Sequence, residues 1–140
     1  MFSRACKYAI KIMIYVAGNE KEERHTGLKE ISMAIGSPEA FSAKILQQLV
    51  KSKLLESYKG PFGGFELMKN REIRLADIHT AIDGDQLVEE CILELQSCSS
   101  KNPCPLHDRF MLIRSHLKET MLSTDIRDEK LHKDLSKLNG

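Results

Sequence analysis

The sequence predicts a mainly α-helical protein with one small β-hairpin, arranged as a winged helix-turn-helix followed by a long C-terminal helix. Three observations predict this class. Two short segments with helical periodicity meet at a Gly-Ser pair at 36–37, a Pro- and Gly-rich hairpin follows at 54–70, and an apolar stripe recurs over 106–121. We expect a winged domain over 1–84, and a cysteine-containing loop, long helix and polar tail over 85–140.

Composition limits the class of protein before any motif is considered. A chain of 140 residues with 41% hydrophobic and 29% charged residues has the size and balance of one globular domain with an appendage. No apolar run approaches the ~20 residues of a membrane span, and the N-terminal segment carries Arg4, Lys7 and Lys11 without a signal-peptide cleavage site. We therefore expect no membrane association and a cytoplasmic protein. Thiols stay reduced there, so four cysteines favour metal or redox chemistry over disulfides.

The first two helices are predicted from capping residues and apolar spacing. Ser3 can cap a helix that continues to about residue 18, and Gly36 is a typical stop for a second, short helix over 28–35. Each helix has apolar residues at three- and four-residue steps, which gives one buried face. These residues are Ala5, Ala9, Ile12 and Val16 in the first helix, and Leu28, Ile31 and Ile35 in the second.

A third helix follows at once, with Ser37 expected as its N-cap and Pro38 at its first position. Phe41, Ile45 and Leu49 are spaced by four and predict its buried face. The residues that point away from this face include four polar side chains that can bond DNA bases or phosphates, or can simply be solvated. They are Ser42, Lys44, Gln48 and Lys51.

The hairpin over 54–70 has two β-prone runs around a Pro- and Gly-rich tip, with Lys59 at its base. A helix-turn-helix followed by a hairpin is a winged helix. Residues 1–70 hold 11 Lys and Arg against 7 Asp and Glu, whereas residues 71–140 hold 10 against 13. The front half is therefore the candidate for binding a polyanion such as DNA.

Three cysteines and a histidine follow with the spacing C-x6-C-x5-C-x2-H: Cys91, Cys98, Cys104 and His107. We expect a short helix over 87–96 and a loop over 97–104. Thiolates are the soft ligands of iron–sulfur clusters, zinc and copper(I). Zinc is the second choice, because structural zinc sites usually contain a pair of cysteines two to four residues apart. Reversible thiol oxidation without a metal is a further alternative.

Pro105 is expected to open the long helix, whose stripe consists of Leu106, Phe110, Ile113, Leu117 and Met121. Such a stripe needs a partner surface, either on the winged domain or on a second subunit. The polar tail over 123–140 is expected to be at most a frayed helix. Three apolar residues could dock it weakly, namely Leu131, Leu135 and Leu138.

The segments "YAIKIMIYVA", "AKILQQL", "KGPFGGFEL" and "IRLADIHTAIDG" resemble the bacterial winged-helix regulators of the IscR, NsrR and CymR (Rrf) type, over essentially the whole chain. The resemblance implies a dimeric DNA-binding transcription factor with helix three in the major groove and the wing in the minor groove. It places a basic wing residue at Lys59 and base contacts at Ala43 and Lys44, although Ala43 has no hydrogen-bonding side chain. We expect Ser37, Ser42 and Gln48 as further polar groups near DNA. The resemblance also implies that the long helix joins two subunits.

The resemblance further implies that Cys91, Cys98 and Cys104 hold an iron–sulfur cluster, with two iron atoms favoured and four possible. His107 is the first choice as the fourth ligand. The competitor is Cys6 of the other subunit, because Lys7 stands where nitric-oxide-sensing relatives have an aspartate; we expect Cys6 to be a buried apolar residue instead. Cluster-assembly proteins are then expected as cluster donors. The other histidines carry no functional signal: His25, His79, His116 and His132.

The sequence therefore predicts a homodimeric transcriptional regulator whose binding to double-stranded operator DNA is modulated by an iron–sulfur cluster. The alternative is a regulator that senses redox state through metal-free thiols or is stabilised by zinc. An enzyme is not expected, since neither a C-x-x-C motif nor a Cys–His–acid constellation is evident.

Overall fold

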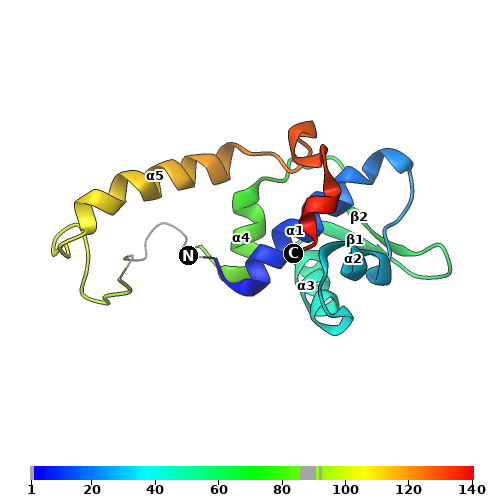
Figure 1. The fold of residues 1–140 in the computed structure, drawn as a ribbon, viewed down its shortest axis with the longest axis horizontal. Helices are drawn as coiled ribbons and strands as arrows, with labels where there is room; N and C mark the ends of the chain where they lie inside the picture. The colour runs from blue at the N-terminus through cyan, green and yellow to red at the C-terminus, as the bar shows by residue number, and fades with distance from the viewer. Residues whose placement is uncertain (1, 86–90, 92) are drawn as a thin grey trace.

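A computed structural model describes residues 2–85, 91 and 93–140, and it confirms the predicted fold class. Figure 1 shows a body of short helices and one hairpin, from which a single long helix projects with the cysteine loop at its far end. The elements are α1 Arg4–Gly18, η1 Glu20–Glu22, α2 Leu28–Ile35, α3 Glu39–Lys51, β1 Leu55–Tyr58, β2 Gly64–Leu67, α4 Leu75–Asp83, α5 His107–Ser123, η3 Glu129–His132 and η4 Leu135–Leu138.

Helix α1 is the centre of the body. Ser3 caps it as predicted, because the Ser3 hydroxyl accepts a hydrogen bond of 3.0 Å from the backbone N–H of Cys6. The apolar face of α1 packs against α2, α3 and α4 and forms one core with them. The fully buried residues of this core include Ala9, Ile12, Met13, Ile31, Ile35, Ile45, Leu46, Leu49 and Ile78.

The turn between α2 and α3 fixes the helix-turn-helix. Gly36 ends α2 in the left-handed region at φ +66°, where glycine is favoured, and the backbone N–H of Ser37 donates to the carbonyl of Ser32. The predicted cap of α3 is wrong by one residue. Pro38 is extended, with ψ 138°, so the helix begins at Glu39 and the Ser37 hydroxyl does not cap it.

The hairpin is antiparallel, with Leu55 opposite Leu67 and Tyr58 opposite Gly64. Thr26, in the connection before α2, exchanges two backbone hydrogen bonds of 2.9 Å with Phe65 and so extends the sheet by one bridge. A side chain at Gly64 would collide with this bridge, since a Cβ there would lie 2.7 Å from the Thr26 carbonyl oxygen. The wing is therefore anchored to the body through its second strand. Lys59 lies exposed at the tip, directly after β1, and not at the base as predicted.

The C-terminal tail is more ordered than the sequence indicates. After α5 the chain returns to the body, and its two short 3-10 helices lie across α1 and α2 (Figure 1). Ile126 is fully buried, while Leu131 and Leu138 pack against the core. Arg127 donates to the backbone carbonyls of Met68 and Arg71, and it also pairs with Glu20 at 3.0 Å. The tail is thus a structural part of the winged body.

Replacing Ile126 with alanine is expected to lower the free energy of unfolding by about 2–5 kcal/mol, because it leaves a cavity where a fully buried side chain stood. Urea denaturation followed by circular dichroism measures this change. The matched control is Met33→Ala, at a side chain that is 69% exposed, and its stability should stay close to that of the unmodified protein. Equal stability of the two variants would mean that the tail does not pack as described.

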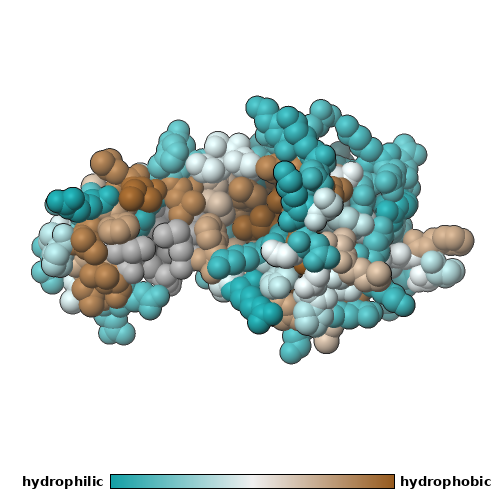
Figure 2. Space-filling view, in the orientation of Figure 1, coloured by the Kyte–Doolittle hydropathy of each residue, from teal (hydrophilic) through white to brown (hydrophobic). Residues whose placement is uncertain are grey.

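Helix α5 has an unusual surface. Its last turns contact α4 and bury Met121, but several apolar residues nearer its start are exposed. Figure 2 shows apolar residues gathered at the projecting end of the molecule. The exposed residues are Met111, Leu112 and Ile113 toward its start, together with Leu122 in its last turn. Among the residues that the structure describes, no helix is long and apolar enough to cross a membrane.

Candidate metal centre and nucleic-acid interface

The three loop cysteines come together in space. The sulfur atoms of Cys91, Cys98 and Cys104 all lie within 4.8 Å of one another, and the Cys91 and Cys104 sulfurs are 3.5 Å apart. The backbone N–H of Cys104 donates to the Cys98 sulfur at 3.3 Å, which fixes the loop around the group. All three side chains are half-buried. Part of the helix predicted over 87–96 lies outside the described residues; Cys91 and residues 93–97 are not helical.

His107 stands beside the thiols at the start of α5. Its Nδ1 atom lies 3.5 Å from the Cys98 sulfur, and its backbone N–H donates to the Cys104 carbonyl at 3.0 Å. Its Nε2 atom is buried without a hydrogen-bond partner among the described residues. His107 therefore contacts the cysteine group from one side, through Cys98.

The loop backbone also adjusts the acidity of the thiols. Hydrogen bonds from the backbone of Leu95 and Leu93 are the main cause that lowers the pKa of Cys91 to about 7. At Cys98 the backbone N–H of Cys104 acts in the same direction, but desolvation and the neighbouring thiols outweigh it and raise the pKa. Near neutral pH Cys91 consequently has a larger thiolate fraction than Cys98.

Cys6 does not lie on the surface where another subunit could reach it. It is fully buried on α1, as expected for an apolar residue, and faces α4. His79, which carries no functional signal in the sequence, lies close to this thiol in the structure. His79 and Asp83 of α4 approach the Cys6 thiol, so that the three donor atoms lie within 4.8 Å of one another. A Cys–His–acid group therefore exists, although its members are far apart in the sequence.

Helix α3 exposes a polar face to solvent, on the side away from the core. Lys44 and Gln48 are exposed, and Ser37 is half-buried in the turn before the helix. Ser42 is different, because it is 0% exposed and its hydroxyl is buried without a hydrogen-bond partner among the described residues. Ser42 lies one residue after Phe41 and three before Ile45, which places it on the buried side of the helix. Because it is buried, Ser42 cannot contact DNA, and this part of the prediction is wrong.

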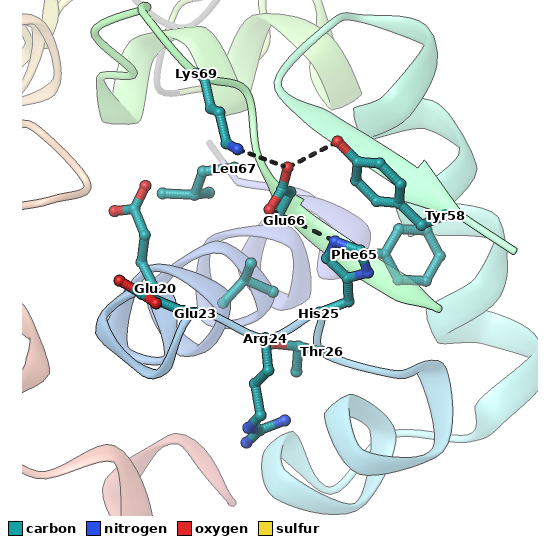
Figure 3. Close-up of a pocket in the computed structure, with 11 residues that line it drawn as sticks. Glu20, Glu23, Arg24, His25, Thr26, Tyr58, Phe65, Glu66, Leu67 and Lys69 are labelled. Carbon is teal, nitrogen blue, oxygen red and sulfur yellow. Dashed lines mark hydrogen bonds and ion pairs between the residues drawn. The ribbon is translucent and has the colours of Figure 1, made fainter. Parts of the chain in front are cut away.

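A cavity of about 550 Å³ lies where the wing meets the connection between α1 and α2 (Figure 3). Glu66 occupies its middle, accepting a 2.8 Å hydrogen bond from the Tyr58 hydroxyl and lying 3.7 Å from both Lys69 and His25. The His25 ring stacks on Tyr58 with centroids 4.0 Å apart. Sequence reasoning missed this group, because its residues are distributed over separate segments. Through these contacts, His25 of the connection holds Tyr58 of β1 and Glu66 of β2 against the body.

The fold and the exposed helix α3 define a DNA-binding protein of the winged helix-turn-helix class. The comparisons with known proteins specify it further. The chain belongs to the Rrf2 family of transcriptional regulators, since the family profile, described as that of an iron-dependent transcriptional regulator, matches residues 2–128. A helix-turn-helix-type transcriptional regulator of Aquifex aeolicus is 31% identical over 131 residues, which cover 91% of this chain and 90% of that protein. As predicted, the protein is a transcriptional regulator and not an enzyme.

Solved structures agree on the fold. CymR, the global cysteine regulator of B. subtilis, superposes with a TM-score of 0.77 over 96% of this chain and 98% of that chain, at 24% identity. IscR of T. potens superposes with a TM-score of 0.71 over 96% and 88% of the two chains, at 21% identity. These likenesses confirm the winged helix-turn-helix with its C-terminal helix.

Proposed function

We propose that this regulator binds operator DNA as a homodimer in the reducing cytoplasm, and that an iron–sulfur cluster held by Cys91, Cys98 and Cys104 modulates this binding. The observation that carries the proposal is the position of the three clustered thiols. They lie in a loop that leads directly into the first turn of α5, the helix that projects from the winged body. A change in this loop would therefore act on the first turn of α5, at the far end of the projecting helix.

The residues of the loop fit such a cluster. Three soft donors converge, and the half-buried His107, whose buried Nε2 has no hydrogen-bond partner among the described residues, stands beside them as the proposed fourth ligand. A neutral imidazole in place of a thiolate raises the potential of a cluster and makes its binding sensitive to protons. We favour two iron atoms, because Cys6, the ligand that would extend the set, is buried against α4. A four-iron cluster is the alternative. When bound, the cluster would make the regulator sensitive to oxygen, nitric oxide or iron shortage.

The homodimer is proposed from the surface of α5. Leu112 is 74% and Ile113 is 56% exposed in the single chain, on a helix that already stands clear of the body. Neighbouring apolar residues of this size on a projecting helix are typical of a subunit interface. A second copy of α5 is the partner that covers them in this proposal.

The DNA interface is proposed on α3 and the wing. Lys44 and Gln48 would reach base edges or phosphates in the major groove, and Ser37 would contact the backbone near the start of α3. Lys59, exposed at the tip of the wing, would enter the minor groove. The anchoring of the wing by Thr26 and the Glu66 group supports this role, because it holds the tip in one place relative to α3.

Replacing Lys59 with alanine is expected to weaken operator binding by roughly three- to tenfold and to reduce the dependence of log K on log salt by about one unit, since one cationic contact is lost. Fluorescence anisotropy over a series of salt concentrations measures both quantities, using a DNA fragment that the protein itself selects from a random pool. Lys133→Ala, at an exposed lysine of the tail, is the charge-matched control. Equal binding by both variants would remove Lys59 from the interface.

The proposal as a whole is tested by purifying the protein without oxygen and measuring its iron, acid-labile sulfide and zinc. Iron and sulfide in equal amounts are expected, together with an operator affinity that changes when the cluster is removed by a chelator. Colourless protein whose zinc is lost in the Cys98→Ala variant would replace the cluster with a structural zinc site in the loop. An operator affinity that is the same with and without cluster would refute the modulation.

The 3.5 Å separation of the Cys91 and Cys104 sulfurs favours a second candidate, in which these thiols sense redox state without a metal. A small movement would bring them to the bonding distance of a disulfide. Metal-free protein after careful cluster reconstitution, with operator binding that responds to thiol oxidation, is the result that this candidate requires.

A further inference from the structure

We propose that Cys6, His79 and Asp83 form a second metal site, at the junction of α1 and α4, which takes a divalent transition metal of the zinc type. The Cys6 sulfur, a His79 ring nitrogen and an Asp83 carboxylate oxygen lie within 4.8 Å of one another. Two elements contribute, α1 with the thiol and the last two turns of α4 with the other two groups. The site shares no residue with the 91–107 loop.

The spacing of the donors is close to that of a tetrahedral site. Bonds of about 2.0–2.3 Å from a zinc ion place neighbouring ligand atoms roughly 3.5 Å apart. His79 Nε2 and Asp83 Oδ2 are 3.7 Å apart, which is near this value and too long for a hydrogen bond. Small side-chain movements would complete the coordination.

The His79 imidazole is buried, and its Nε2 atom approaches Asp83 at 3.7 Å without a hydrogen bond. His79 is 3% exposed, and its Nε2 atom has no hydrogen bond among the described residues. Buried polar atoms are nearly always paired, so an unpaired ring nitrogen that faces a thiol and a carboxylate indicates a missing ligand. A metal ion between these groups would satisfy all three.

Neighbouring residues already orient the donors. The ring of Phe2 meets the ring of His79 edge-on, with centroids 5.6 Å apart and planes at 75°. The backbone N–H of Ser3 donates to Asp83 Oδ2 at 2.9 Å, and the Ser3 hydroxyl donates to the other carboxylate oxygen. Contacts of this kind, made by residues that do not touch the metal, hold ligands in place in metalloproteins.

The donor types select the metal. One sulfur, one imidazole nitrogen and one carboxylate oxygen suit zinc and its neighbours, whereas magnesium and calcium need oxygen ligands. The same three residue types do not form a catalytic triad here, because burial and the adjacent Asp83 raise the pKa of the Cys6 thiol to about 12. A dication beside the sulfur reverses that preference and displaces the proton.

The site lies where it can affect the rest of the molecule. It ties the first turn of α1 to the last turn of α4, and Gly84 follows directly as the chain leaves the winged body toward the cysteine loop. Metal binding would therefore fix the exit of the chain relative to the DNA-binding body, independently of the loop's own cofactor.

The experiment uses the full chain with Cys91, Cys98 and Cys104 replaced by serine, so that Cys6 is the only remaining cysteine of the four. Co²⁺ is the probe, added to the folded protein and also during refolding. We expect one Co²⁺ per chain, a sulfur-to-cobalt charge-transfer band in the near ultraviolet, and loss of that band on addition of Zn²⁺. The band can come only from Cys6, so its appearance tests this site and is unaffected by the fate of the proposed cluster.

Three variants in the same background complete the test. Cys6→Ala should abolish the band, and His79→Gln should weaken Co²⁺ binding at least tenfold, whereas His116→Gln, at an exposed histidine, should bind Co²⁺ with unchanged affinity. Circular dichroism confirms that each variant is folded. A folded triple-serine protein that gives no band after either treatment would overturn the proposal, and so would a band that is unchanged in His79→Gln.

Discussion

Replacing Cys98 with alanine is expected to reduce the iron and sulfide content of the anaerobically purified protein to below about a tenth of the unmodified level. Cys98 is central to the loop. Its sulfur accepts a hydrogen bond from the backbone N–H of Cys104 and contacts His107 at 3.5 Å, so its removal takes away one ligand and the contact that places another. Metal and sulfide analysis measures the loss.

The matched control is Cys6→Ala, because it removes a thiol that is buried between α1 and α4 and leaves the loop intact. Its cluster content should equal that of the unmodified protein. Full loading of the Cys98→Ala protein would exclude Cys98 as a ligand. Loss of loading in Cys6→Ala alone would instead assign the cluster to a set that includes the α1 cysteine.

Replacing Ile113 with glutamate is expected to weaken dimerisation at least ~100-fold, or about 2.7 kcal/mol, because the proposed interface would then have to bury a carboxylate without a partner. Operator affinity should fall with it, since two half-sites must be bound together. Light scattering coupled to size-exclusion chromatography, over a range of protein concentrations, gives the dimer dissociation constant.

Ser115→Glu introduces the same charge into the same helix at an exposed polar position, and it should leave the dimer unchanged. A dimer of normal affinity for Ile113→Glu would show that the exposed apolar residues of α5 serve another purpose. Because Ile113 is 56% exposed in the single chain, the folding of a protomer should be little affected.

Most of the fold could be predicted from the sequence, because local signals agree with one another along the first 84 residues. Ser3, Gly36 and the Gly-rich hairpin mark element boundaries by their own conformational preferences, and the apolar spacing of α1, α2 and α3 identifies the faces that become the core. Ser42 shows the limit of this reasoning. Serine is common on exposed helix faces, and only packing decides that this one is buried.

The cysteine group could be predicted because its ligands are close in the sequence, within the 17 residues of 91–107. The group of Cys6, His79 and Asp83 could not, because more than seventy residues separate its thiol from its imidazole, and no local pattern indicates that α1 and α4 pack together at that point. The bracing of the wing by His25, Tyr58 and Glu66 was hidden for the same reason.

Arg127 couples the movement of the projecting helix α5 to that of the wing. It follows α5 in the chain, and its guanidinium group holds the carbonyls of Met68 and Arg71, just where the polypeptide leaves the second strand of the wing. The end of the projecting helix that lies near the body is therefore tied to the wing through the Arg127 side chain. In the proposed dimer on DNA, any rotation of α5 would have to carry the wing with it or break these hydrogen bonds, so one movement would set both the spacing of the two half-sites and the depth of the wing in the minor groove.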